Sequence, residues 1–421
     1  MNILQNRELE KHKENAHSSL GNLTFPTKKE EDWKYTRISE INPEHYAPAK
    51  QNPVSQQIVD ENSLEGLDSF KIVFVDGVFS EKFSNYPKEK LIVLPFSEAV
   101  KEEKYHRILS SKFDSIVDKE QYFTLLNTVS TKEGTFIYVP KNTAEEKPVE
   151  LIYINTPQEQ KASQTIRNLF IVEDNSQILV TERIHTLSDF GFLTNAVTEI
   201  FIGKNSHFRL YKIQDDVPTA CLVDATFVEQ DQDSQAFVHT FAFGGKVIRN
   251  ELSFDHKGEN INSTLKGITI IEGEQEVGNH TLVRHNQPNC ESHELYRGIY
   301  NDKAHGIFNG KIKVHKIAQK TNAFQQNNTI LLSDKAEIDT KPQLEIFADD
   351  VKCSHGCTVG QLDTDALFYM KQRGIHEKEA KALLMFAFCA DVMETVTLPE
   401  LKNKINKIIA RKLDVNIDFD F

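Results

Sequence analysis

A long succession of short β-branched segments between residues 134 and about 350 restricts the fold of this chain more than any other feature. Apolar and β-branched residues cluster, for example, at 149–154, 196–202, 265–271 and 307–314. No stretch with the 3.6-residue apolar period of an amphipathic helix separates these segments. We therefore expect an all-β unit of roughly 200 residues, with other kinds of structure before and after it.

A turn-like pattern recurs through this block, in which an Asp, an Asn or a neighbouring polar residue precedes a small residue. The spacings between successive small residues are 30, 28, 29, 41 and 32. Periods of about 20–50 residues are typical of solenoids, whose coils each contribute strands and a turn. Ordinary β-turns in a sandwich would use the same residue types, but the repetition favours the solenoid. The small residues are Ser176, Ser206, Ser234, Ser263, Ala304 and Ala336.

The chain as a whole is expected to be mainly β, with three regions. Residues 1–130 form an N-terminal region that mixes helices and strands, residues 131–355 form the β-solenoid core, and residues 356–421 form a C-terminal helical domain. Within the first region, the apolar runs at 71–75 and 91–94 predict buried strands.

Polar residues in the N-terminal region mark where its helices should begin. Thr27 and Glu30 have the spacing of a capping box, which predicts a helix or helical turn directly after them. Ser97 and Asp118 are suitable N-caps for two further helices. Trp33, the only tryptophan, is expected to anchor this region by burial.

Three helices are predicted in the C-terminal region. A short one ends at Arg373 before Gly374, a second covers 377–391, and a third begins at Pro399. The second helix carries a wide apolar stripe. These helices could cover the open end of the solenoid core or present an apolar face to a partner protein. The stripe consists of Ala380, Leu383, Leu384, Ala387 and Phe388.

The net charge and the composition limit the binding partners and the cellular location that can be expected for this chain. The 49 Lys and Arg against 62 Asp and Glu give a net charge of −13, which argues against non-specific binding to nucleic acid or to an anionic membrane. The first 15 residues lack the apolar core of a signal peptide, and the longest apolar run, 383–390, is too short to span a bilayer. Five scattered cysteines are unlike a secreted disulfide framework. We therefore expect a cytoplasmic protein.

Common enzyme motifs are missing from the sequence. It contains no nucleotide-binding phosphate loop, no dinucleotide-binding glycine pattern and no nucleophile elbow. His293 and Glu294 begin like a zinc-protease helix, but Arg297 stands where the second histidine is required. These observations weigh against an enzyme. A solenoid enzyme acting on sugars or nucleotides would instead need carboxylates that converge on one face.

One short segment combines ligand-type side chains. Cys353, His355 and Cys357 alternate with other residues, so in an extended strand they would share one face. Thiol and imidazole groups on one face suit a soft metal, although this spacing is not a standard zinc motif. Buried packing and metal or cluster ligation are both open interpretations, and a structural zinc protein is one form of the second. Further candidate ligands upstream are His280, His285, Cys290, His293, His305 and His315.

The stretch from Ile346 to Asp363, which includes this segment, closely resembles the SufB/SufD family of iron–sulfur cluster assembly proteins, and in particular its SufD branch. The segment Glu31–Thr36 is similar to a motif that the SufD branch carries and the SufB branch generally lacks. The resemblance implies a right-handed parallel β-helix with helical terminal regions. It also implies a complex with a SufB-like paralogue and a SufC-like ABC ATPase, and a homodimer when the chain is isolated.

The resemblance also implies roles for individual residues. Cys353 and His355 fall on family positions that are linked to the interface with the paralogue and to the handling of iron or a nascent cluster. The resemblance assigns no role to Cys357, which is either a third ligand or a thiol that fills space. Leu383, Leu384 and Phe388 are expected to contact the ATPase. No permanent cofactor is expected, only transient iron or an iron–sulfur cluster at the shared interface. The alternatives are a SufB-type scaffold and a cytosolic zinc-binding solenoid.

Overall fold

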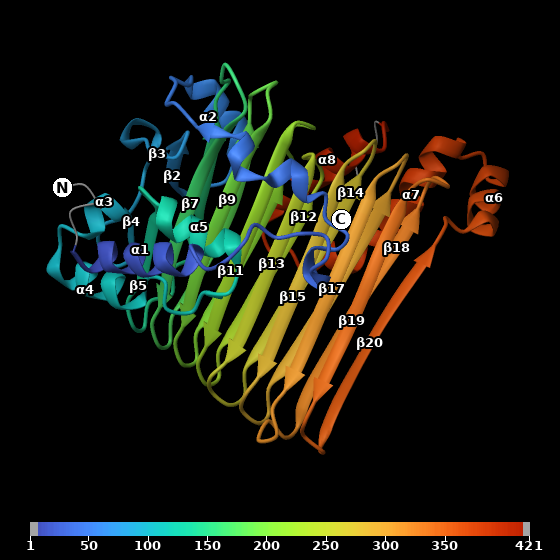
Figure 1. Cartoon of the computed structure of the whole chain (residues 1–421). Helices are drawn as coiled ribbons and strands as arrows, with labels where there is room; N and C mark the ends of the chain where they lie inside the picture. The colour runs from blue at the N-terminus through green and yellow to red at the C-terminus, as the bar shows by residue number, and fades with distance from the viewer. Residues whose placement is uncertain (1–6, 416–421) are drawn as a thin grey trace.

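A flattened parallel β-solenoid forms the centre of the computed structural model, which describes residues 7–415 (Figure 1). From β5 onward, successive strands alternate between two sheets, so that β7 pairs with β9 and β8 pairs with β10. Every strand pair within this core is parallel. The expected mainly β fold with a solenoid core is therefore confirmed.

The odd-numbered and even-numbered strands make separate sheets. The odd-numbered core strands are β5 (Thr135–Val139), β7 (Ala162–Val172), β9 (Phe192–Ile202), β11 (Ala220–Gln230), β13 (Val247–His256), β15 (Glu276–His285), β17 (His305–Val314) and β19 (Glu337–Ile346). The even-numbered strands are β6 (Val149–Asn155), β8 (Gln177–Thr186), β10 (His207–Gln214), β12 (Gln235–Ala242), β14 (Asn262–Ile271), β16 (Glu291–Tyr300), β18 (Thr321–Leu331) and β20 (Val351–Gly360). The core boundary expected at residue 355 falls inside β20.

The coil repeat arises from stacked turns with left-handed backbone. Asn142, Asn175 and Asn205 all have positive φ values, and the Nδ2 of each later asparagine donates to the Oδ1 of the previous one, at 3.1 and 2.9 Å. Asparagine tolerates this backbone conformation better than most residues do. The strand register gives a coil of 27 to 31 residues from Gln177 to Lys352.

Two members of the sequence repeat were assigned wrongly. Ala304 and Ala336 precede β17 and β19, whereas Ser176, Ser206 and Ser234 precede strands of the other sheet. The spacing of 41 residues between Ser263 and Ala304 arises because the first lies beside a turn on one edge of the solenoid and the second at a turn on the other edge. Both edges need tight turns with a left-handed residue, so the same turn chemistry occurs at each.

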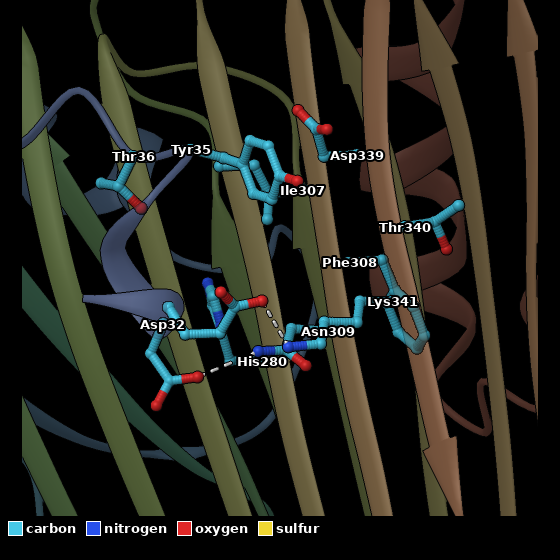
Figure 2. Close-up of a pocket in the computed structure, with 11 residues that line it drawn as sticks. Asp32, Tyr35, Thr36, His280, Ile307, Phe308, Asn309, Asp339, Thr340 and Lys341 are labelled. Carbon is cyan, nitrogen blue, oxygen red and sulfur yellow. Dashed lines mark hydrogen bonds and ion pairs between the residues drawn. The ribbon is translucent and has the colours of Figure 1, made fainter. Parts of the chain in front are cut away.

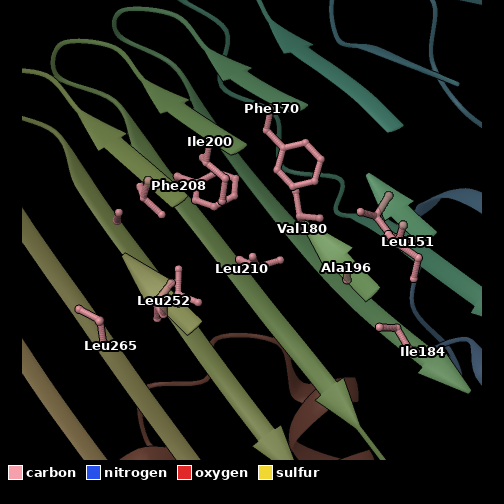
Figure 3. Packing of buried hydrophobic residues seen from close by; sticks show 14 of the residues in the cluster. Leu151, Phe170, Val180, Ile184, Ala196, Ile200, Phe208, Leu210, Leu252 and Leu265 are labelled. Carbon is pink, nitrogen blue, oxygen red and sulfur yellow. The ribbon is translucent and has the colours of Figure 1, made fainter. Parts of the chain in front are cut away.

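Apolar side chains from the inner faces of both sheets form the main core (Figure 3). Phe170, Ile200, Phe208 and Leu210 are all fully buried there. A cluster of ionisable groups lies inside this core: the Lys212 ammonium is 2.7 Å from Asp224 and 3.3 Å from Glu182, and all three side chains are 3% exposed. Burial raises the pKa of Glu182 to about 7, although Lys212 opposes this shift.

The N-terminal region closes the first end of the solenoid and covers the odd-numbered sheet. Its strands β2 and β4 confirm the two strands expected there. The capping-box prediction is fulfilled by a single 3₁₀ turn, Glu31–Trp33, and the Glu30 carboxylate accepts a hydrogen bond from the Thr27 N–H at 2.8 Å. The elements are α1 (Arg7–Leu20), β1 (Ala47–Pro48), α2 (Gln56–Asn62), β2 (Phe70–Val75), β3 (Val78–Phe79), β4 (Ile92–Pro95), α3 (Phe96–Ala99), α4 (Glu103–Lys112) and α5 (Tyr122–Ser130).

The segment 31–36, which we call the strap, crosses the outer face of the odd-numbered sheet. The Trp33 ring is 9% exposed, and the Arg249 guanidinium lies 3.7 Å from its centroid. Arg249 also donates to the Asp32 carbonyl at 2.8 Å. The expected burial of Trp33 is thus confirmed, and the strap is fastened to β13.

Three C-terminal helices follow β20 and fold back over the even-numbered sheet. They are α6 (Thr364–Gln372), α7 (Glu377–Met393) and α8 (Pro399–Lys412). The Asp363 carboxylate caps α6, and Gly374 follows it with φ +87°, as the sequence predicted. Within residues 7–415, none of the helices is both long and apolar enough to cross a membrane.

The suggestion that these helices cover the open end of the core is wrong. Side chains of α7 and α8 pack with Tyr211, Phe241 and Ile268 on the outer face of the even-numbered sheet. Leu383 and Leu384 are only half-buried, because a different stripe of α7 faces the sheet. That stripe consists of Ala382, Met385, Phe386, Cys389, Val392 and Met393.

Candidate functional site

The last coil of the solenoid is uncovered. Among the strands of residues 7–415, β19 pairs only with β17 and β20 only with β18, so each strand has a free edge. Such an edge presents unpaired N–H and C=O groups that can bind another strand. Large apolar side chains are also exposed here, with Phe347 59% and Val359 49% accessible. We call the free edges of β19 and β20 the open end.

The three candidate ligands lie together on β20. Cys353, His355 and Cys357 are in register with Ala323, Gln325 and Asn327 of β18, which are 0%, 1% and 4% exposed. The candidate ligands therefore share the face that looks into the solenoid, at its mouth. The prediction that the three side chains share one face of an extended strand is therefore confirmed. Their role as ligands stays a prediction.

The three side chains differ in environment. Cys353 is half-buried and packs against the small apolar cluster around Ile312 and Val314, whereas His355 and Cys357 are exposed. Burial raises the pKa of the Cys353 thiol, and the Ala323 backbone opposes that shift. A metal ion that binds Cys353 must therefore displace its proton.

Two buried polar residues stand directly behind His355. Glu294 of β16, Gln325 of β18 and His355 occupy matching positions on successive strands. The Gln325 Nε2 donates to the Glu294 carboxylate at 3.1 Å, and the Thr281 hydroxyl donates to the same oxygen at 2.7 Å. Gly310 leaves room for this arrangement, since a Cβ there would lie 2.2 Å from the Gln325 Nε2.

This polar row is incompletely paired. The Oε1 atoms of both Glu294 and Gln325 are buried and have no hydrogen-bond partner in the described part of the chain. Burial raises the pKa of Glu294 to about 7, against the hydrogen bonds from Thr281 and Gln325. Unpaired buried acceptors are uncommon in folded proteins. The two Oε1 atoms could therefore accept a proton, a hydrogen bond from a donor group, or a cation at the mouth of the solenoid. The sequence analysis did not identify Gln325 as a functional candidate.

The upstream histidines and cysteine do not converge on β20. His285 is buried beside His256, with ring centroids 4.5 Å apart, and Cys290 is buried in the turn before β16. His293 stacks on Phe324 at the outer face. His280, His305 and His315 lie elsewhere on the coils. Among residues 7–415, no three His, Cys, Asp or Glu side chains are close enough to hold a metal ion.

The strap reaches the open end from the opposite face. A pocket of about 140 Å³ lies between the strap and strands β17 and β19 (Figure 2). The Asn309 amide donates to Asp32 at 3.3 Å, and the Lys341 ammonium pairs with Glu31 at 2.6 Å (Figure 2). One of the two motifs that carry the family resemblance therefore forms part of the last coil, and the other, the strap, contacts β17 and β19.

The residues expected to bind a partner on α7 have unequal environments. Phe388 is half-buried beneath the Arg297 guanidinium, 4.9 Å from its ring centroid, and Arg297 also pairs with Asp391. Leu383 and Leu384 are half-buried without a stacked cation.

Two protein-family models match the chain. The one described as "SUF system FeS cluster assembly, SufBD core domain" matches residues 153–388. The one described as "SufBD protein N-terminal region" matches residues 3–151. Together they span the N-terminal region, the solenoid and α7 up to Phe388.

Several characterised proteins are similar over most of their length. The iron-sulfur cluster assembly protein SufD of Escherichia coli (strain K12) is 30% identical over 394 residues, covering 92% of this chain and 89% of the relative. SufD of Bacillus subtilis (strain 168) is 28% identical, covering 77% and 75%. An iron-sulfur cluster assembly SufBD family protein of Synechocystis is 27% identical, covering 94% and 90%.

Proposed function

Because this chain belongs to the SufBD family of iron–sulfur cluster assembly proteins, we propose that it acts as a SufD-like assembly component rather than as an enzyme. In this proposal it pairs with a SufB-like paralogue and binds a SufC-like ABC ATPase in the cytoplasm. Two relatives that are named SufD support the SufD branch over a SufB-type scaffold.

The open end is the observation that carries the proposal. β19 and β20 each offer a free parallel edge, and a paralogue with the same solenoid could continue both sheets across the interface. The exposed side chains of Phe347 and Val359 would be buried by this pairing. In the absence of the paralogue a second copy of the chain could use the same edges, so we expect the isolated protein to form a homodimer.

Iron or a nascent cluster would be handled where the two chains meet. Cys353 and His355 supply one thiol and one imidazole at the mouth, and Cys357 on the same face could supply a third ligand. A closed cluster site usually needs about four ligands, so the paralogue would provide the remainder. Incomplete ligation suits a substrate that has to leave again.

The C-terminal helices would transmit the action of the ATPase. The chain passes from β20 through residues 361–363 directly into α6 and then α7, so a displacement of these helices acts on β20. Leu383, Leu384 and Phe388 are the proposed ATPase contacts. ATP-driven movement would then favour an open state in which iron or a cluster can reach Cys353 and His355. Such a shift requires that the ATPase makes different contacts with the helices in the closed and the open state.

The test compares His355→Ala with His207→Ala, a matched change at an exposed histidine on the start of β10. We expect His355→Ala to leave co-purification with the SufB-like and SufC-like partners intact and to lower iron–sulfur cluster reconstitution, measured by visible absorbance and iron and sulfide content. Cluster formation equal to that of His207→Ala would remove His355 from the proposed function.

A second comparison tests the ATPase contacts. Changing Leu383 and Leu384 together to Asp should abolish co-purification with the SufC-like ATPase and leave the SufB-like partner bound. Changing the exposed Phe190 to Asp, in the loop before β9 and outside the C-terminal helices, is the matched control. An ATPase that still co-purifies with the double variant would contradict the assignment of this face.

A further inference from the structure

A gap interrupts the odd-numbered sheet beside β7, at the end of the solenoid opposite to β20. On one side β7 pairs along its whole length with β9. On the other side β1 pairs only with Ala162 and Ser163, and β5 pairs only from Asn168 onward. Within the described part of the chain, residues 164–167 therefore have no strand partner on that side.

The gap opens into a cavity of about 780 Å³. Ligand-binding pockets typically have volumes of about 300–1,000 Å³. Apolar side chains line this cavity from three directions. They are Phe123, Leu126 and Val129 of α5, Leu193 of β9, and Val78 and Phe79 of β3.

A buried carboxamide lines this cavity without any partner. Gln164 is 7% exposed, and neither its Oε1 nor its Nε2 makes a hydrogen bond with any of the residues 7–415. Burying a donor and an acceptor without partners is unfavourable, because both groups lose their hydrogen bonds to water. A ligand that offers one acceptor and one donor side by side, as a peptide unit does, would satisfy both atoms.

The backbone of β7 offers a second donor and acceptor pair. The Ser163 carbonyl accepts from the Ala49 N–H at 2.9 Å, which places the polar groups of residue 163 on the β1 side. Alternate residues of a strand direct their backbone groups to the same side. The N–H and C=O of Thr165 therefore point into the gap, where neither the described turns nor β1 supplies a partner.

Two lysines and two acids line the cavity, and they differ in how fully they are paired. The Lys13 side chain is 12% exposed and pairs only loosely with Glu10, at 3.7 Å. Burial and the nearby Lys132 both lower the pKa of Lys13, while Glu10 raises it. The acids of the cavity are already engaged, since Asp76 accepts from Asn52 and Thr156, and Glu133 accepts from Ser97 and Gly134.

We propose that this cavity binds an extended peptide segment of a partner protein, which adds a short parallel strand to β7 in the gap between β1 and β5. The segment carries apolar side chains toward α5 and β3 and at least one carboxylate toward Lys13. Thr165 and Gln164 hold its backbone. This site is separate from the open end and does not depend on the proposed cluster chemistry.

A defined probe tests the proposal with the full chain. The probe is a fluorescently labelled peptide, acetyl-Val-Asp-Val-Asp-Val amide, whose binding is followed by fluorescence anisotropy. Two altered probes accompany it: one has both Asp replaced by Lys, and the other carries an N-methyl group on the central peptide nitrogen. We expect each alteration to weaken binding by at least about 10-fold, because the first loses the charge pairing and the second loses a backbone donor.

Matched variants locate the binding site. Gln164→Leu should weaken probe binding by about 10-fold, while leaving the melting temperature unchanged or higher, because it removes two unpaired buried atoms. Gln177→Leu, at an exposed position of β8, is its control. Lys13→Met should lower the affinity and reduce its salt dependence, whereas Lys11→Met on the exposed face of α1 should not.

Several outcomes would overturn the proposal. They are no detectable binding of the acidic probe, equal binding of the N-methylated probe, or equal affinities of Gln164→Leu and Gln177→Leu. A probe that binds Gln164→Leu normally but fails to bind a variant of the open end would place the peptide elsewhere. Binding of the acidic probe that is lost in Gln164→Leu and retained in His355→Ala would support the site independently of the proposed function.

Discussion

Gln325 and His355 occupy matching positions on the neighbouring parallel strands β18 and β20, and the Oε1 atom of Gln325 is buried without a partner. Adjacent parallel strands lie about 4.8 Å apart, so an imidazole N–H at position 355 can reach this acceptor. A hydrogen bond there would fix the orientation and tautomer of His355 and leave its other nitrogen free for iron. Gln325 would then position the ligand without touching iron itself.

Gln325→Leu should therefore impair cluster handling without disrupting the complex. We expect cluster formation in the assembled complex to slow by about 10-fold, the lower end of the range for loss of a residue that orients a metal ligand. Partner co-purification should persist, and Gln325→Glu, which keeps an acceptor, should recover part of the rate. Equal rates for Gln325→Leu and the unchanged protein would show that His355 acts without this support.

Glu294→Gln should change the pH dependence of stability. The pKa of Glu294 is raised by burial to about 7, above its usual value of 4.5, so the buried carboxyl group favours its protonated form. This contribution to stability is complete below pH 4.5 and is lost as the pH rises through about 7, because the unfolded chain ionises first. The shift corresponds to a loss of about 3 kcal/mol at neutral pH.

The measurement for Glu294→Gln is a series of denaturant titrations between pH 4.5 and 8. The stability of the variant relative to the unchanged protein should increase with pH across this window, because glutamine cannot ionise. Glu145→Gln, at a turn outside the core, is a control that should show no such trend. A constant difference between Glu294→Gln and the unchanged protein would contradict the raised pKa.

Lys212→Met should strongly destabilise the core. The substitution leaves Asp224 and Glu182 buried without their cation, and breaking a buried ion pair in this way typically costs about 3–5 kcal/mol. Lys204→Met, at an exposed turn, should change the free energy of unfolding by less than about 0.5 kcal/mol. Chemical denaturation monitored by circular dichroism distinguishes the two, and a similar small effect for both would refute the electrostatic account.

The double change Phe347→Asp and Val359→Asp should prevent pairing at the open end. Both side chains are largely exposed in the isolated chain, so the monomer should keep its melting temperature. Charges placed on a free edge oppose strand addition, and the paralogue should no longer co-purify. Retention of the paralogue at normal yield would locate the interface on another surface.

The architecture could be predicted from the sequence because the solenoid repeats one local pattern. The turn residues and the β-branched runs appear in nearly every coil, and misassigning Ala304 and Ala336 did not affect the fold class. Strands such as β15, Glu276–His285, did not stand out because polar residues occupy many of their positions. Their neighbours in the stack, rather than their own hydrophobicity, determine that they are strands.

The candidate site was only partly predictable for a related reason. The spacing within Cys353–Cys357 places its ligands on one face of a strand, and the strand register agrees. Glu294, Gln325 and His355 are 31 and 30 residues apart, a coincidence that becomes informative only when the coil length is known. For α7 the pattern was ambiguous, because Leu383 lies on one apolar stripe and Met385 on another, and only tertiary packing selects between them.

The strap has a consequence for the order in which the molecule is completed during synthesis. Residues 31–36 leave the ribosome long before β17 and β19, to which Asp32 and Glu31 are bound in the finished protein. Domains generally begin to fold from the N-terminus as they are made. The strap is therefore already folded when the last coils are synthesised. β17 and β19 can pack against it as soon as they leave the ribosome, which is also when the free edges of the last coil first form.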